Sequence, residues 1–318
     1  MKKLVCLLLI ILSSLSLFAC GNSAPTFSVD FPLPWQSSAA VNAYEKSVFT
    51  VEKVDVTTNQ VIGEGVLTYV IDFDHKDENN ISYSQLTSTF EMTYNDNAPE
   101  KDRGLTDYVM SKTVFLSTAL TPTHTMKAVQ LAPRAGEKAN LSYSLETDYV
   151  GGVSKMTLNG VDSQLNFAKK NLSGVYDNEM LYYVVRSYPK LNELSSYLTF
   201  KLANFVDMHL ENAYKTYTMQ IAPDVEQAEQ TVYLPGLKGR FGLGDEGAVT
   251  ATNISVSINS TLSGPPIDLL YSKTPFIVGE GLTTKRALVG ISTYEYDVSK
   301  SELKYQTNYT LSDYSVTP

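Results

Sequence analysis

Apolar and polar residues alternate along most of this chain, and this alternation limits what it can fold into. Successive side chains of a β-strand point to opposite faces, so a period of two predicts strands with one buried and one solvated face. The run from Phe49 to Val56, the polar residues 57–60 and the run from Val61 to Phe73 together predict a hairpin. No helical crossovers separate the alternating runs, which excludes doubly wound α/β folds.

Similar runs cover most of the chain after residue 80. The glycines Gly151 and Gly152 allow positive φ in a tight turn, so they predict a hairpin between 141–149 and 154–158. A strand pair is expected over 81–94, and further strands over 113–119, 125–131, 198–206, 214–221, 231–234, 249–258, 269–271, 286–296 and 303–311. These roughly 13 strands predict an all-β, mainly antiparallel fold, in the form of a curled sheet, a half-barrel or a sandwich.

One segment departs from the alternation and predicts a helix. Asp177 is a candidate N-cap, and apolar residues follow at positions i, i+1, i+4 and i+5 counted from Met180. We expect a helix of about ten residues that ends before Pro189. A second helix could form at 191–197, so the fold should contain one or two short helices between 178 and 197.

The N-terminal segment has the layout of an export signal. Two lysines precede an uncharged, largely apolar run from Leu4 to Phe18, and the small residue Ala19 lies directly before Cys20. The run is too short for a comfortable membrane span, which needs about 20 apolar residues. An ordinary cleaved signal peptide with an incidental cysteine is one interpretation, since Phe18 is bulky for its position.

The stretch from Leu17 to Cys20 also resembles the lipobox of bacterial lipoproteins. This resemblance implies that a diacylglyceryl group is attached to the Cys20 sulfur and that cleavage leaves Cys20 as the first residue. The protein would then be exported and anchored by its acyl chains to the extracytoplasmic face of the cell membrane. We therefore divide the chain into a signal peptide (1–19), a lipidated tether (20–38) and a single large β domain (39–318) that could subdivide near 170–178.

Charge and cysteine content narrow the choice of partners. The net charge is −9, and without the two N-terminal lysines 23 basic and 34 acidic residues remain, a net charge of −11. The basic residues are scattered, which argues against nucleic acid as a partner and against binding of a polybasic patch to anionic lipid. Because Cys6 lies in the signal segment, a chain that starts at Cys20 has no second thiol and no internal disulfide. The protein would then be attached to the membrane through its lipid anchor alone.

The sequence matches to metal-binding and nucleotide-binding motifs lack the surrounding residues that such sites need. The carboxylates around His75 lack the glycine and the fixed ligand positions of a calcium loop. The three histidines have no zinc-ligand spacing. Residues 242–247 fit G-x-G-x-x-G, but Asp245 and Glu246 would repel phosphate and a strand pattern follows. We expect no cofactor and no metal, and a flexible connection over 235–247 that could cover a pocket.

Motifs for catalysis are equally weak. Two S-x-x-K matches, at Ser187 and Ser301, do not place serine and lysine on one helical turn. The chain also lacks a G-x-S-x-G motif. We therefore expect no enzyme activity, while a carbohydrate-active hydrolase stays open because the separation of two carboxylates is invisible in a sequence.

Parts of the body resemble a known kind of exported protein. Residues 178–189, residues 267–273 and the closing hairpin look like an uncharacterised family of exported bacterial β-rich proteins. That family is similar in architecture to the periplasmic lipoprotein carriers. The resemblance covers about 176–311, and it implies a curved sheet that holds acyl chains against a helical plug.

Tyrosines near the predicted helix indicate where a ligand could bind. Their apolar faces and polar tips suit binding surfaces, although tyrosine is also common in strands. We expect a protein of unknown activity that binds an apolar or amphipathic ligand in a deep cavity of the curved sheet. A structural or protein-interaction module of the cell envelope is the alternative. The candidate ligand-binding residues are Tyr182, Tyr183, Arg186, Phe205 and Tyr271.

Overall fold

The computed structural model shows most of the predicted β domain. The residues it describes are 42–76, 78–116, 121–133, 141–158, 160–166, 175–186, 198–203, 217–222, 229–258, 266–279, 282–297 and 302–317. The predicted signal peptide and tether with Cys20, the candidate Phe205 and the expected helix at 191–197 lie outside these residues.

The described residues form 18 strands, which is more than the expected number, and short helical segments. The strands of the first half are β1 (Tyr44–Asp55), β2 (Gln60–Lys76), β3 (Ser82–Tyr94), β4 (Thr106–Leu116), β5 (Thr121–Leu131), β6 (Leu141–Asp148), β7 (Val153–Leu158), β8 (Val161–Asn166) and β9 (Val175–Asp177). Those of the second half are β10 (Leu198–Ala203), β11 (Tyr217–Ile221), β12 (Glu229–Tyr233), β13 (Ala248–Ile258), β14 (Ile267–Ser272), β15 (Ile277–Val278), β16 (Leu282–Thr283), β17 (Leu288–Asp297) and β18 (Glu302–Thr317).

Sixteen of these strands belong to one sheet in the order β8-β7-β6-β5-β4-β3-β2-β1-β18-β17-β14-β13-β11-β10-β9, and β12 pairs with β13. The neighbouring strands run antiparallel except β9 and β10, which pair in parallel. The first strand, β1, lies beside the last, β18, in the middle of the sheet. The expected all-β, mainly antiparallel fold is therefore confirmed.

Several details differ from the expectations. Residues 82–94 form the single strand β3 and not a strand pair, because no turn interrupts their alternation. The hairpin of β6 and β7 is confirmed, with Gly152 at a φ of 74° in its turn. The strands β8 and β9 were not expected, since β8 is exposed along its whole length and β9 has only three residues.

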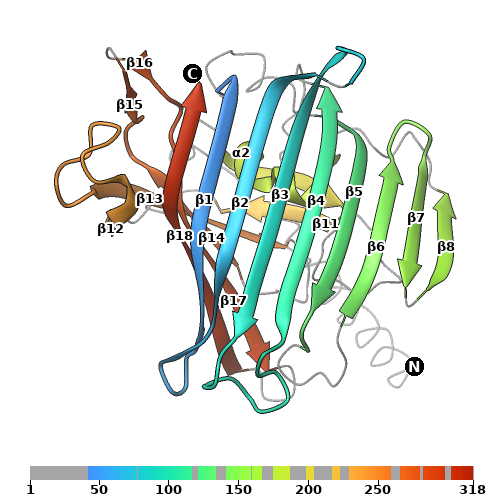
Figure 1. Ribbon diagram of the computed structural model, residues 1–318, viewed down its shortest axis with the longest axis horizontal. Coiled ribbons are helices and arrows are strands. Elements are labelled where there is room, and N and C mark those ends of the chain that lie inside the picture. Colours follow the sequence, from blue (N-terminus) through green and yellow to red (C-terminus); the bar gives the residue numbers. More distant parts are fainter. Residues whose placement is uncertain are drawn as a thin grey trace, which may run out of the picture.

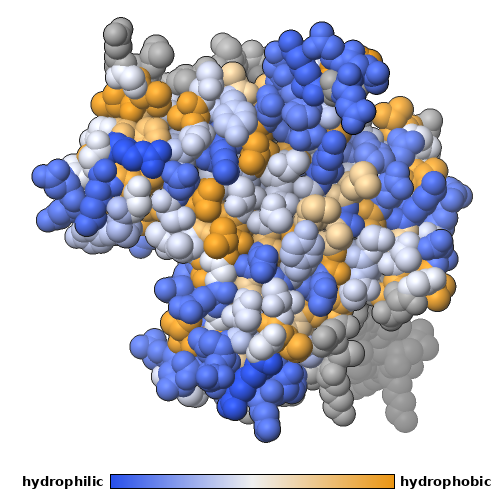
Figure 2. Space-filling view, viewed as in Figure 1, coloured by the Kyte–Doolittle hydropathy of each residue, from blue (hydrophilic) through white to orange (hydrophobic). Residues whose placement is uncertain are grey.

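The sheet curls so that strands from its two halves face each other across a shared core (Figure 1). In the view of Figure 1, β1 to β8 form the front, while β13, β14 and β17 lie behind them. Buried side chains from both halves, among them Phe49, Ile71, Leu269 and Tyr314, belong to one hydrophobic cluster. On the outward face of the front strands, hydrophilic and intermediate residues are interspersed with apolar ones, as Figure 2 shows. This is the division between one buried and one solvated face that the alternation predicts.

The predicted helix forms inside the curl. It consists of the 3-10 turn η2 (Asn178–Met180) and the α-helix α2 (Leu181–Arg186). Leu181, Val184 and Val185 are buried in the core, so the apolar stripe holds the helix in place. The helix lies between the front and rear strands, where it can contact both (Figure 1).

The connection at 235–247 is packed against the sheet and does not act as an open flap. Its 3-10 turn η5 (Pro235–Leu237) contacts β18, and Arg240 forms an ion pair of 2.9 Å with Asp313. The Phe241 ring stacks on Phe276 at 5.7 Å between ring centres. These contacts correct the expectation of a flexible cover.

Candidate ligand-binding site

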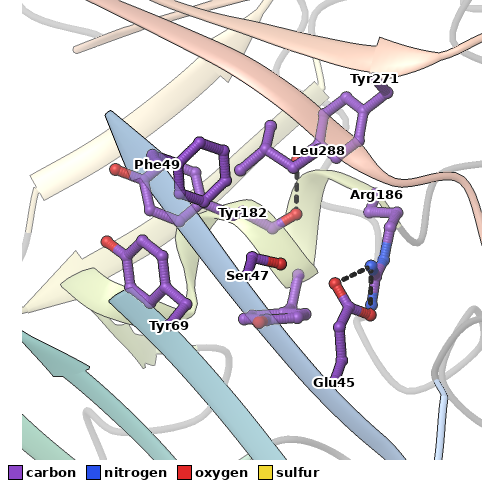
Figure 3. Close-up of a pocket in the computed structure, with 9 residues that line it drawn as sticks. Glu45, Ser47, Phe49, Tyr69, Tyr182, Arg186, Tyr271 and Leu288 are labelled. Atoms are coloured by element: carbon purple, nitrogen blue, oxygen red, sulfur yellow. Dashed lines mark hydrogen bonds and ion pairs between the residues drawn. The ribbon is translucent and has the colours of Figure 1, made fainter. Parts of the chain in front are cut away.

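A small pocket lies between α2 and strands β1, β2, β14 and β17 (Figure 3). Its volume is about 10 Å³, which leaves room for about one water molecule. The deep cavity expected from the sequence is therefore not formed at this site. The lining residues are Glu45, Ser47, Phe49, Tyr69, Tyr182, Tyr183, Arg186, Tyr271 and Leu288.

Four of the five candidate residues named from the sequence line this pocket. Tyr182, Tyr183 and Arg186 come from α2, and Tyr271 comes from β14. The structure thus brings together residues that are almost 90 positions apart in the chain. The fifth candidate, Phe205, lies outside the described residues.

The lining residues on β1 and β2 were missed by sequence reasoning. Glu45 and Ser47 alternate in phase with Phe49 and Val51, and all four are buried on the inner face of β1. A carboxylate in phase with core residues is the signal that could have identified Glu45, because a buried carboxylate needs a partner.

That partner is Arg186. The Nη1 atom of Arg186 donates to both carboxylate oxygens of Glu45, at 2.9 and 2.8 Å. Asn42 also donates to Glu45, at 2.6 Å, and the guanidinium lies 4.9 Å from the centre of the Tyr183 ring. Burial lowers the pKa of Arg186, but the negative charge of Glu45 outweighs it and raises the pKa, so the arginine stays charged.

The tyrosines fix α2 to both halves of the sheet. The Tyr271 hydroxyl donates to the backbone oxygen of Tyr182, at 2.5 Å. The Tyr69 ring meets the Tyr182 ring edge-on, at 5.0 Å between centres. Burial raises the pKa of Tyr69, Tyr183 and Tyr271. Their hydroxyls therefore stay protonated and can serve as hydrogen-bond donors, whereas they are poor bases.

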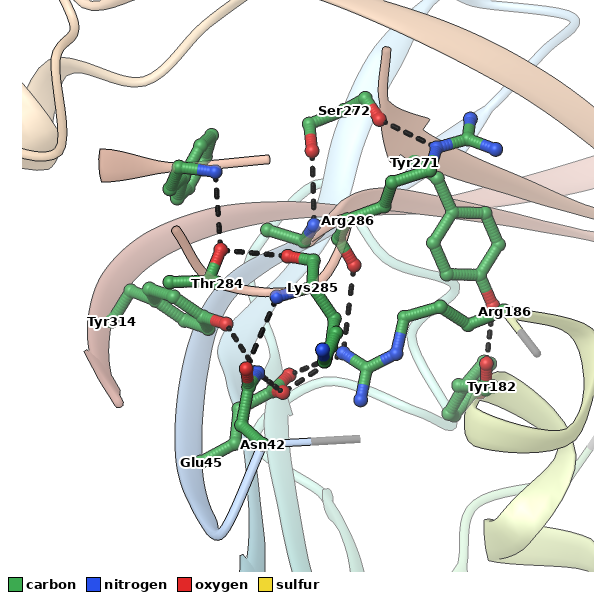
Figure 4. A network of polar contacts seen from close by, with 12 residues as sticks. Asn42, Glu45, Tyr182, Arg186, Tyr271, Ser272, Thr284, Lys285, Arg286 and Tyr314 are labelled. Atoms are coloured by element: carbon green, nitrogen blue, oxygen red, sulfur yellow. Dashed lines mark hydrogen bonds and ion pairs between the residues drawn. The ribbon is translucent and has the colours of Figure 1, made fainter. Parts of the chain in front are cut away.

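A second arginine lies on the other side of Tyr271 (Figure 4). Arg286 donates through Nε to the backbone oxygen of Ser272 at 2.8 Å and through Nη2 to the Thr252 hydroxyl at 3.0 Å. Its guanidinium carbon is 5.9 Å from the centre of the Tyr271 ring. Burial lowers the pKa of Arg286. Among the described residues no carboxylate lies within ion-pair distance of it.

A wider and more open groove, of about 470 Å³, crosses the outward face of β5 to β8. Exposed side chains that line it include Met126, Ser144, Glu146, Lys155, Asp162 and Gln164. Two carboxylates in an open groove are what a carbohydrate-active hydrolase would need. However, Glu146 is 51% exposed and Asp162 is also exposed, so neither has the burial that adapts a carboxyl group to act as a general acid.

Another polar cluster, which is largely buried, ties strands together. Lys53 forms an ion pair of 2.6 Å with Glu295 and donates to the Tyr94 hydroxyl at 3.0 Å. Tyr94 in turn donates to Asp107 at 3.0 Å. The cluster links β1, β3, β4 and β17, and it accounts for charged residues that point into the core.

Within the described ranges, no group of three or more His, Cys, Asp or Glu side chains could hold a metal ion. The helices in those ranges are all too short, or not apolar enough, to cross a membrane.

Comparison with known proteins supports the fold. No protein-family model matches the chain, and no curated protein matches it. Among solved structures, the chain is similar to a beta-barrel-like protein of domain of unknown function DUF1849 from Brucella abortus. The TM-score is 0.51 at 8% identity, over 88% of this chain and 100% of that one. At this identity the likeness concerns the fold alone, and it agrees with the expected similarity to uncharacterised β-rich proteins: the chain has a barrel-like β fold of unknown activity.

Proposed function

We propose that this protein is an exported lipoprotein, anchored to the extracytoplasmic face of the cell membrane through Cys20, that binds an amphipathic ligand beneath α2. The observation that carries the proposal is the convergence of aromatic and charged side chains from four elements on one small site. Glu45 and Tyr69 come from β1 and β2, Arg186 from α2, and Tyr271 from β14. Pockets that bind small molecules combine apolar walls with a few oriented polar groups, as this one does.

The size of the pocket determines how such a ligand would bind. At about 10 Å³ the site accepts only a small polar group, and only if α2 moves or a side chain rotates. The helix has six residues, and its links to the sheet include the Tyr271 hydrogen bond and the Glu45 ion pair. We infer that the polar head of the ligand enters beneath α2 while its apolar part lies against aromatic rings.

Blocking the pocket tests this proposal. Ser47 lines the pocket and is 3% exposed, so Ser47→Leu should fill the available space. Ser82 is exposed on β3, and Ser82→Leu is the matched control. We expect a fluorescent fatty-acid analogue to bind the wild-type protein and the control, and to bind Ser47→Leu at least about tenfold more weakly. Equal binding by both variants, each with a wild-type circular dichroism spectrum, would place the ligand elsewhere.

Anchorage is tested separately. In cells fed a radiolabelled fatty acid, the wild-type protein should carry the label and sediment with membranes. Cys20→Ser should lose both, because it removes the sulfur that forms the thioether. A Cys20→Ser protein that keeps the label would contradict attachment at this residue.

A second candidate function is an interaction module of the cell envelope, and the open groove over β5 to β8 favours it. Its exposed Lys155 lies among acidic and polar side chains that a protein partner could contact. A photo-crosslinking residue in place of Lys155 should then capture an envelope protein in intact cells. The same residue in place of Lys112, which is exposed on β4 outside the groove, is the control.

A further inference from the structure

Arg186 uses only one side of its guanidinium group. The Nη1 atom donates to Glu45 and lies 3.5 Å from the backbone oxygen of Arg286. The Nε and Nη2 atoms are buried and have no hydrogen-bond partner. Figure 4 shows the guanidinium with its dashed lines on the Nη1 side only. Since buried donors without partners are costly, this edge needs an acceptor that the described side chains do not supply.

The unused edge has a defined shape. Nε and Nη2 carry two nearly parallel N–H bonds, a geometry that matches the two oxygens of a planar carboxylate. The Arg186 side chain is 3% exposed and lines the pocket beneath α2. A group that meets this edge would therefore enter through the pocket and not from bulk solvent.

The local charge favours an anion over a neutral acceptor. Glu45 balances the charge of Arg186, whereas Arg286 lies beside Tyr271 with no carboxylate within ion-pair distance among the described residues. The Arg286 guanidinium thus places a positive charge without an ion-pair partner beside Tyr271, which lines the pocket. A water molecule fits the present volume and could accept both hydrogen bonds, but it leaves this charge unbalanced.

We propose that the Nε–Nη2 edge of Arg186 binds the carboxylate of the amphipathic ligand, an inference that rests on the function proposed above. The ligand class is then a monocarboxylate with an apolar chain. The hydroxyls of the lining tyrosines are protonated and do not repel the incoming carboxylate. The carboxylate replaces the water molecule that the closed pocket can hold.

The test compares two ligands that differ in the head group alone, and it adds inorganic phosphate as a free anion. Equilibrium dialysis would measure octanoate, octanol and inorganic phosphate on the lipidated full chain in nanodiscs, with empty nanodiscs subtracted. Arg186→Lys keeps a positive charge for Glu45 but removes the two-pronged edge. Arg240→Lys is the matched control, since Arg240 lies on the surface in an ion pair with Asp313. Arg286→Gln removes the uncompensated charge and leaves the Arg186–Glu45 pair intact.

We expect octanoate to bind at least about tenfold more tightly than octanol, and Arg186→Lys to abolish this preference. Arg286→Gln should reduce it, and Arg240→Lys should retain it. If octanoate and octanol bind equally, the carboxylate inference is wrong while the pocket function stands. If neither binds, both proposals fail and the edge holds water only. If phosphate competes with octanoate at similar concentrations, the site takes free anions and the amphipathic ligand is overturned.

Discussion

The Lys127 ammonium lies 2.9 Å from a carboxylate oxygen of Asp177, and neither side chain is exposed to solvent. Lys127 is on β5, in the front of the sheet, whereas Asp177 ends β9 at the far edge of the strand order. Glu179 lies 2.5 Å from the same ammonium, and the Tyr149 hydroxyl donates to Asp177 at 2.9 Å. This buried group therefore connects two parts of the sheet that are not hydrogen-bonded neighbours.

Within this group, Glu179 does not titrate like the acid of an ordinary ion pair. Burial raises the pKa of Glu179 to about 8; Lys127 opposes the rise and Asp177 adds to it. Burial lowers the pKa of Lys127, but Asp177 and Glu179 outweigh it and raise the pKa to about 12. At neutral pH the lysine is charged, and Glu179 is largely protonated.

Removal of the shared cation should destabilise the fold strongly. Lys127→Met leaves Asp177 buried without its counter-charge, and we expect a loss of about 3–5 kcal/mol in the free energy of unfolding. Lys112→Met, on the exposed face of β4, is the matched control and should change stability by about 0.5 kcal/mol or less. Urea denaturation measures both, and equal losses would contradict the role of the buried group.

Glu179 should make stability depend on pH. Its pKa rises from an ordinary 4.5 to about 8 on folding, so the unfolded chain loses its proton first as the pH increases. Stability should therefore fall between about pH 4.5 and about pH 8 and then level off. Glu179→Gln mimics the protonated form, and it should reduce this slope.

The quantity to compare is the pH dependence of the free energy of unfolding in the wild-type protein and in Glu179→Gln. A difference is needed because Asp102 and Asp107 also have raised pKa values and contribute a slope of the same sign. Urea denaturation at several pH values in this range would measure the difference. Parallel curves for the wild-type protein and Glu179→Gln would show that Glu179 titrates normally.

Tyr271→Phe should loosen α2 without disturbing the core. It deletes the hydroxyl that donates to Tyr182, and we expect a loss of about 1 kcal/mol. Hydrogen exchange of the amides of residues 181–186 should accelerate, because the helix loses one of its links to β14. Tyr296→Phe, at a tyrosine that is 44% exposed on β17, should leave both quantities unchanged. Unchanged exchange in Tyr271→Phe would show that other contacts hold the helix.

Gly236→Ala should detach the packed connection from β18. A Cβ atom at Gly236 would lie 2.0 Å from the backbone oxygen of Ser312, so the backbone must shift, at a cost of about 1–3 kcal/mol. Gly244 is in the same connection and has free space around its Cβ position. Gly244→Ala is therefore the control, and thermal denaturation should separate the two variants.

The alternation predicted the class of the fold because each strand shows its own burial pattern locally. Strand β8 escaped prediction because its Val161 and Leu165 are 69% and 49% exposed, so no buried stripe marks it. Strand β9 escaped because it has only three residues and its partners are distant in the chain: Lys127, which pairs with Asp177, is 50 positions away. Short strands held by distant partners leave no periodic signal.

The candidate site was predicted in part for the same reason. The helix pattern and nearby aromatics pointed to Tyr182, Tyr183 and Arg186, whereas the ion pair with Glu45 spans 141 positions. The volume of the pocket could not be predicted either. It depends on how Tyr69, Tyr271 and Leu288 pack around α2, and three-dimensional packing alone decides this.

The pairing of β1 with β18 has a consequence for the order in which the protein acquires its structure. Among the described strands the ribosome makes β1 first, yet its neighbour on one side, from Tyr305 to Thr317 of β18, is made after all the others. Until then β1 and β17 each present an unpaired edge to which other chains can add. A nascent chain that folded early would expose both edges, so this topology favours a chain that stays unfolded until β18 has been made.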